Sequence, residues 1–165
     1  MTDDRQLPFF VYGTLKPGSI NYKRYNLAEA TVSELSATLD RAALYTDGIY
    51  PFVLLLDDAR PDDQVQGFVL TLADAHYPRL LRELDDLEEY DPDALPEQSW
   101  LVRRVIHVRL ASGAAVETWI YLAGPAVTAQ IKAGKLTRVT SGDWPIDLPR
   151  LADRAPGCEG AQREA

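Results

Sequence analysis

The sequence predicts an α+β protein, in which a mixed, barrel-like sheet of about six strands packs with one long helix and short helices. Short apolar runs rich in β-branched and aromatic residues alternate with turn-forming glycines and prolines, which is typical of strands. One longer segment shows helical periodicity instead. A chain of 165 residues, of which 46% are hydrophobic, has the size of one domain with a substantial core.

Six segments have the composition of strands. Asp47-Gly48 and Ser112-Gly113 favour turns between neighbouring strands, and Pro51 also interrupts an apolar stretch. The predicted strands cover residues 7–12, 41–45, 52–56, 66–72, 100–110 and 116–122.

Residues 74–87 form the predicted long helix, and residues 126–133 form a short one that ends at Gly134. The long segment places apolar side chains at helical spacing, and Pro92 prevents it from continuing. This apolar stripe consists of Tyr77, Leu80, Leu81, Leu84 and Leu87. We expect residues 1–149 to form a single domain and the polar residues 150–165 to form a flexible C-terminal tail.

The charge balance argues against nucleic-acid binding. The chain has 25 Asp and Glu residues against 17 Lys and Arg residues, a net charge of −8, and its basic residues do not cluster beyond Arg103 and Arg104. The one cysteine, Cys158, cannot form an internal disulfide or a thiolate zinc site. Neither histidine lies beside a nucleophile motif, and no signal peptide or membrane-spanning run is recognisable. We therefore expect a cytoplasmic protein that binds neither nucleic acid nor a membrane.

One residue of the acidic segment 83–93 differs from its neighbours. Most of these carboxylates, Asp85 included, are expected on the solvated face of the helix. Glu88, however, projects within about 20° of Tyr77 and Leu81, inside the apolar stripe. Partial burial and the negative end of the helix dipole would raise its pKa, as a general acid/base requires. A structural ion pair with Arg103 or Arg104 explains the same position equally well.

A second candidate is the loop Tyr12-Gly13-Thr14-Leu15, which follows the first predicted strand. A glycine there lets the backbone approach a ligand, and successive N–H groups can hold a carboxylate or an oxyanion. The loop lacks both glycine-rich nucleotide-binding patterns. A plain junction between a strand and a turn also explains it.

Taken together, the two candidates resemble the gamma-glutamylcyclotransferase-like (AIG2-like) family. That family has an N-terminal YG[ST]L loop and an L-D-x-x-E-G-Y segment with one catalytic glutamate, and residues 84–90 here are LDDLEEY. Gly48-Ile49-Tyr50-Pro51, Gly67-Phe68-Val69, Trp119-Ile120-Tyr121 and Ser141-Gly142-Asp143-Trp144 are similar too. The resemblance extends from Phe9 to Trp144 and implies the gamma-glutamyl cyclotransferase-like fold. It departs at Glu89, where the family usually has glycine.

The resemblance implies an enzyme that cyclises a γ-glutamyl amide to 5-oxoproline, with no metal or organic cofactor. The substrate's own α-amine attacks its γ-carbonyl, and Glu88 moves the proton to the leaving nitrogen. The backbone of Gly13, Thr14 and Leu15, beside Tyr12, would hold the α-carboxylate or the oxyanion. A Tyr121 hydroxyl that faces the cavity would orient the carboxyl end of the substrate or donate to the oxyanion.

Two other functions remain open at this stage. The same cavity in a non-catalytic protein would bind a small carboxylate or an acyl metabolite, and Glu88 would then recognise the ligand or have a structural role. Alternatively, the acidic segment 83–93 would serve as a protein interaction surface. Neither the leaving group of the substrate nor the oligomeric state follows from the sequence.

Overall fold

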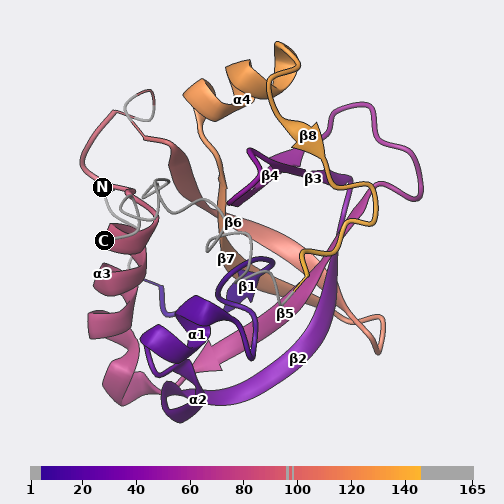
Figure 1. Ribbon diagram of the computed structural model, residues 1–165. Helices are drawn as coiled ribbons and strands as arrows, with labels where there is room; N and C mark the ends of the chain where they lie inside the picture. The colour runs from indigo at the N-terminus through magenta and orange to yellow at the C-terminus, as the bar shows by residue number, and fades with distance from the viewer. Residues whose placement is uncertain (1–4, 96, 98, 146–165) are drawn as a thin grey trace.

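A computed structural model describes residues 5–95, 97 and 99–145. Five strands close into a barrel, in the order β1-β5-β2-β6-β7 (Figure 1). All neighbouring pairs are antiparallel except β1 and β7, which run parallel and close the barrel where Phe9 pairs with Trp119. The barrel strands are β1 (Phe9–Val11), β2 (Thr31–Asp40), β5 (Gln64–Leu72), β6 (Leu101–Leu110) and β7 (Ala115–Ala123).

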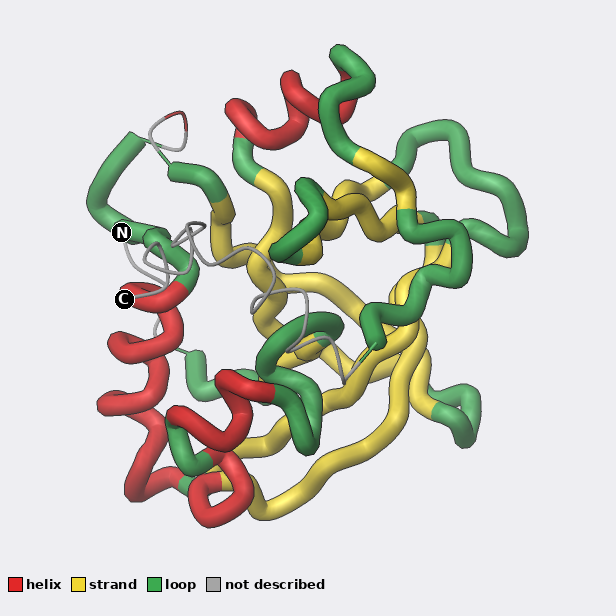
Figure 2. The backbone as a smooth tube through the Cα atoms, viewed as in Figure 1, coloured by secondary structure: helices red, strands yellow, loops and turns green. Residues whose placement is uncertain are grey.

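A separate three-stranded antiparallel sheet contains β3 (Ala42–Thr46), β4 (Pro51–Leu55) and β8 (Thr137–Arg138), in the order β4-β3-β8. The hairpin between β3 and β4 turns at Gly48, whose φ of 102° is readily adopted only by glycine. The Asp47 carboxylate accepts hydrogen bonds from the N–H groups of Ile49 and Tyr50 and holds this turn. In the view of Figure 2, this sheet lies at the top of the molecule with α4 (Pro125–Lys132).

The long helix α3 (Tyr77–Leu87) follows a short 3₁₀ turn, η1 (Asp74–His76). Four of the five residues of its apolar stripe are buried in the main core together with Phe9 and Trp119, and Leu81 is partly buried against it. Full burial of an apolar side chain contributes about 1.5–3 kcal/mol, so this stripe fixes the helix against the barrel. Two short helices, α1 (Ile20–Arg24) and α2 (Leu27–Ala30), lead into β2.

The predicted fold class is confirmed, and each of the six predicted strands is present with small shifts at its ends. The expected number of strands was too low, because β2 and β8 were not predicted. In β2, Val32 and Leu35 are exposed, and a register shift between Thr31 and Ser33 interrupts the alternation. β8 has only two residues, and α1 and α2 are too short to show a periodicity. The expected tail at residues 150–165 and Cys158 lie outside the described residues.

Within the part of the chain that the structure describes, no helix has the length and hydropathy needed to cross a membrane.

Candidate functional site

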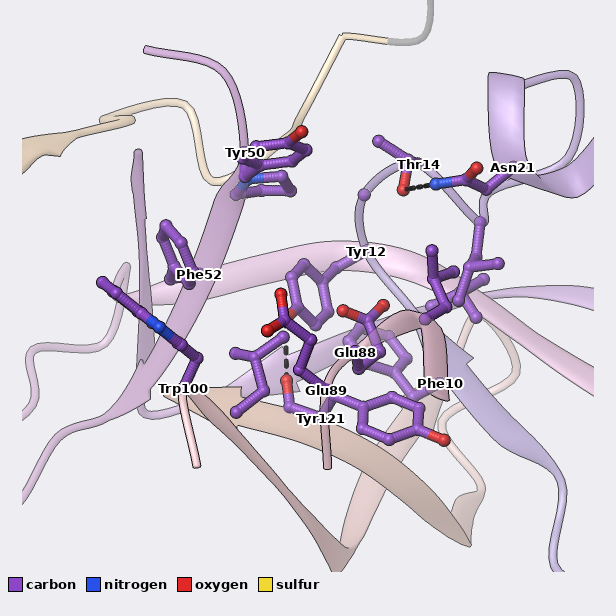
Figure 3. A pocket seen from close by; sticks show the side chains of 16 residues that line it. Phe10, Tyr12, Thr14, Asn21, Tyr50, Phe52, Glu88, Glu89, Trp100 and Tyr121 are labelled. Atoms are coloured by element: carbon purple, nitrogen blue, oxygen red, sulfur yellow. Dashed lines mark hydrogen bonds between the residues drawn. The ribbon is translucent and has the colours of Figure 1, made fainter. Parts of the chain in front are cut away.

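One pocket brings the two sequence-predicted features together (Figure 3). It lies where the loop after β1, residues 50–52, the C-terminal end of α3 and strand β7 meet. Its enclosed volume is about 70 Å³, well below the roughly 300–1,000 Å³ of a site that surrounds a drug-sized ligand. A pocket of this volume suits one end of a small molecule and not a whole drug-sized ligand.

The loop at residues 12–15 forms one wall of the pocket. The Thr14 carbonyl accepts hydrogen bonds from the N–H groups of Asn21 (3.0 Å) and Tyr22 (3.2 Å), and the Thr14 hydroxyl accepts one from the Asn21 amide (2.9 Å). The Gly13 carbonyl accepts a hydrogen bond from the Lys16 N–H. These contacts occupy the carbonyls of Gly13 and Thr14 and the hydroxyl of Thr14. Among the backbone hydrogen bonds of the described residues, neither the Thr14 N–H nor the Leu15 N–H donates to a carbonyl.

Gly13 is required for packing against the hairpin of the small sheet. A Cβ at this position would lie 2.5 Å from Cγ of Pro51, much closer than real Cβ contacts. The absence of a side chain therefore brings the loop against residues 50–52, which form the opposite part of the pocket. Gly13 thus makes a close protein contact in addition to lining the pocket, and its predicted role in letting a ligand approach stays a prediction.

Lys16 fixes the far end of the loop. Its side chain is buried, and its ammonium group donates to the Asp143 carboxylate at 2.8 Å and to the Trp144 carbonyl. Two segments far apart in the sequence are thereby joined behind the pocket.

The helix α3 ends in a Schellman motif that presents two adjacent carboxylates to the pocket. The Tyr90 N–H bonds to the Asp85 carbonyl and the Glu89 N–H bonds to the Asp86 carbonyl, as this motif requires. Glu88 is the C-cap and is half-buried, and Glu89 has a φ of 54° in the left-handed region. Glycine usually occupies that position, because it has no Cβ to clash there. Glu89 replaces this glycine, and its side chain also lines the pocket.

A buried network of hydrogen bonds supports the base of the pocket. The Asp85 carboxylate accepts from Arg103 Nε at 2.9 Å, from Arg103 Nη2 at 3.3 Å and from the Tyr121 hydroxyl at 2.6 Å. The Tyr12 hydroxyl donates to the Tyr121 carbonyl at 2.6 Å. The Arg103 guanidinium also lies 4.3 Å from the centre of the Trp119 ring. We call Tyr12, Asp85, Arg103 and Tyr121 the floor. Tyr12 and Tyr121 line the pocket, and Asp85 and Arg103 support them through hydrogen bonds without lining it.

The floor corrects two predictions. Asp85 was expected on the solvated face, but it is only 7% exposed, because the Arg103 guanidinium neutralises its charge inside the core. The ion pair considered for Glu88 and Arg103 is made by Asp85 instead, and Arg104 donates to the Arg103 carbonyl.

The protonation of the floor residues follows from burial and nearby charge. Burial raises the pKa of the Asp85 carboxyl, and the Tyr121 hydrogen bond and the Arg103 charge oppose this rise. Burial also raises the pKa of the Tyr12 and Tyr121 hydroxyls well above their ordinary value. The negative charge of Glu88 adds to both shifts. Both tyrosines are therefore neutral hydroxyl donors near the Glu88 carboxylate.

All six residues singled out in the sequence, Tyr12, Gly13, Thr14, Leu15, Glu88 and Tyr121, line this one pocket. The expectation for the Tyr121 hydroxyl is not met in this structure, because the hydroxyl donates to Asp85 and not into the cavity. Sequence reasoning did not place the ten other lining residues in the pocket. We call four of them the rim: Tyr50, Phe52, Glu89 and Trp100. The Tyr50-Pro51 pair was noticed as similar to the family, but it had no assigned role.

The described residues contain no group of three or more His, Cys, Asp or Glu side chains arranged to hold a metal ion.

The family model described as gamma-glutamyl cyclotransferase, AIG2-like, matches residues 9–145. The structure is similar to an AIG2-like protein from mouse, with a TM-score of 0.51 and 22% identity over 71% of this chain and 76% of that chain. It is also similar to YkqA from Bacillus subtilis, with a TM-score of 0.53 and 20% identity over 85% of this chain and 40% of that chain. At these identities the two structures show a shared fold alone.

A third similar structure, the urea amidolyase of K. lactis, has a TM-score of 0.54 and 15% identity over 92% of this chain and 8% of that chain. No protein with a curated description matches the sequence significantly. The family model covers most of the chain, including the loop at residues 12–15 and the end of α3. The chain therefore belongs to the gamma-glutamyl cyclotransferase, AIG2-like family.

Proposed function

We propose that this protein cyclises the γ-glutamyl group of a γ-glutamyl amide to 5-oxoproline and releases a free amine. One observation carries the proposal: the loop at residues 12–15 and the Glu88 carboxylate line the same small pocket. Membership of the family supports the general kind of reaction. The roles given below to individual residues are part of the proposal.

The nucleophile in this reaction belongs to the substrate. Its α-amine attacks the γ-carbonyl carbon, a new C–N bond closes the five-membered ring, and the bond from that carbon to the leaving nitrogen breaks. The amine and the carbonyl are tethered in one molecule, so their effective concentration is high without a serine or cysteine nucleophile. One proton must move from the attacking nitrogen to the leaving nitrogen.

Glu88 is suited to move this proton. Its half-buried side chain lies at the C-terminal end of α3, where desolvation and the negative end of the helix dipole both favour the protonated carboxyl. A single carboxylate that gains and loses a proton readily serves as base in the first step and as acid in the second.

The N–H groups of Thr14 and Leu15, with the backbone of Gly13, would hold the α-carboxylate of the substrate or the developing oxyanion. Tyr12 and Tyr121 form the wall below them. The Tyr121 hydroxyl already donates to Asp85. In the proposal, Tyr121 therefore contacts the substrate through its ring and holds the Asp85 carboxylate in place.

The test is the release of 5-oxoproline from a panel of γ-glutamyl amino acids and γ-glutamyl amines, measured by mass spectrometry. Glu88→Gln keeps the size of the side chain and removes the titrating group, so kcat should fall about 10²–10⁴-fold. Glu83→Gln is the matched control, because Glu83 lies on the same helix in an exposed ion pair with Arg79. It should retain the activity of the wild type.

Three outcomes separate the possible functions. Product from the wild type and the control, but not from Glu88→Gln, supports the proposal. Equal activity in Glu88→Gln rejects Glu88 as the proton carrier. Tight binding of the amides without product from any variant rejects cyclisation and favours a non-catalytic binding protein.

A further inference from the structure

Glu89 places a second carboxylate beside Glu88 at the opening of the pocket. Its side chain lines the pocket and is exposed to solvent, unlike the half-buried Glu88. Among the described residues that line the pocket, these two are the only charged side chains. The Arg103 guanidinium of the floor is paired with Asp85, so two neighbouring lining carboxylates favour positive charge in a bound molecule.

The rest of the rim is aromatic. Tyr50, Phe52 and Trp100 line the same pocket, and Figure 3 shows them on the side opposite Thr14 and Asn21, with both glutamates in between. An ammonium group is attracted to the faces of aromatic rings, and the attraction is strongest when a carboxylate lies nearby and water is partly excluded. The aromatic side of the pocket therefore has the composition of a site for an organic cation.

Two ends of the pocket thus differ in what they can bind. The end near residues 12–15 offers N–H donors, which suit a carboxylate. The end near the rim offers a carboxylate and aromatic rings, which suit a cation. With a volume of about 70 Å³, the pocket suits a ligand whose one end lies near residues 12–15 and whose other end lies against the rim.

From this arrangement we infer that Glu89, with Tyr50, Phe52 and Trp100, selects γ-glutamyl amides whose leaving amine carries a second, positively charged group, as in the amide of a diamine. The inference rests on the proposed function, since it assigns the glutamyl end to the loop at residues 12–15. In this binding mode, the leaving nitrogen of the substrate lies near Glu88. The substituent on that nitrogen then passes Glu89, the next residue along the backbone. Amides whose leaving group ends in a carboxylate are disfavoured by the same charge.

The experiment compares three γ-glutamyl amides whose leaving amines have similar length and different charge. They are the amides of 1,4-diaminobutane, of n-butylamine and of 4-aminobutyrate, which end in an ammonium, a methyl and a carboxylate group. Binding is measured by calorimetry in the Glu88→Gln background, in which the proposed reaction is blocked and the ligands stay intact. Glu89→Gln is added to this background to remove the charge of the rim at nearly constant shape.

The expected order of affinity is ammonium, then methyl, then carboxylate, with at least about a tenfold difference between the first and the last. Adding Glu89→Gln should reduce this difference to about twofold or threefold, and added salt should reduce it in the parent background. Adding Asp86→Asn instead is the matched control. Asp86 is an exposed carboxylate on the same helix end that does not line the pocket, so its removal should leave the order unchanged.

The inference is overturned if none of the three amides binds, if they bind equally, or if the order persists without Glu89. It is also overturned if Asp86→Asn removes the order as completely as Glu89→Gln does. Assay of the wild type for 5-oxoproline with the same compounds tests the proposed function separately. Binding in the expected order without any product would reject cyclisation and leave the role of Glu89 supported.

Discussion

The floor and the rim of the pocket are built in different ways. The floor residues Asp85, Arg103 and Tyr121 are buried and bonded to one another, and their positions follow from a barrel strand pair and one helix. The rim residues come from the β3–β4 hairpin, the end of α3 and the approach to β6; Glu89 is exposed, Tyr50 and Trp100 are half-buried, and Phe52 is buried. A substitution in the floor therefore disturbs several hydrogen bonds together, whereas a substitution in the rim changes the surface that a ligand contacts.

This difference separates stability from selectivity. Removing one partner of a buried ion pair strongly lowers the free energy of unfolding, because the other charge then stays in the core without a counter-charge. An exposed side chain at the opening has no such penalty. The floor should therefore tolerate little change, and the rim should vary with the ligand.

The largest expected effect is that of Asp85→Asn in the floor. The substitution leaves the buried Arg103 guanidinium without its counter-charge, and such losses cost about 3–5 kcal/mol of the free energy of unfolding. Urea denaturation followed by circular dichroism measures it. The exposed neighbour Asp86→Asn should change stability by less than about 0.5 kcal/mol. Equal effects of the two substitutions would remove the distinction between floor and helix surface.

The next effect is that of Tyr121→Phe, which removes one donor from the Asp85 carboxylate and leaves the ring in place. Asp85 Oδ1 still accepts from Arg103 Nε, so the loss is that of one hydrogen bond to a charged group, about 1.5–3 kcal/mol. Because the hydroxyl donates to Asp85 and not into the cavity, the pH profile of the cyclisation should keep its shape. A large shift of the profile with little loss of stability would instead show that the hydroxyl acts on the substrate.

The smallest effect has the opposite sign and belongs to the rim. Glu89→Gly should increase the free energy of unfolding by about 1 kcal/mol, because glycine adopts the left-handed conformation at this position without strain. Thermal denaturation checks the gain. Glu89→Ala removes the carboxylate and keeps the Cβ, so it should give no comparable gain. Equal stabilisation by alanine would mean that the charge, and not the backbone conformation, is the costly feature.

The sequence was sufficient for the fold class and for the parts of the site with local signals. Glu88 could be found because helical periodicity places it among apolar side chains, and the loop at residues 12–15 because a strand ends there at a glycine. Asp85 was misjudged because its burial depends on Arg103, 18 residues away, and a helical wheel contains no such partner. The same reason applies to Trp100 and Phe52, which reach the pocket through the arrangement of separate strands. β2 was missed because its exposed apolar residues and irregular pairing hide the alternation.

The closure of the barrel has a consequence for how the molecule is made. β1 has three residues, and it pairs with β7 at Phe9 and Trp119, while the Tyr12 hydroxyl reaches the Tyr121 carbonyl 109 positions along the chain. Contacts of such high sequence separation form late, because the whole intervening chain must first be ordered. On the ribosome, the loop at residues 12–15 is synthesised among the first segments and has local partners at Asn21 and Tyr22, yet Tyr12 acquires its partner on β7 only after residue 121 has emerged. Ligand binding would therefore report the last step of refolding, after the local hairpins have formed.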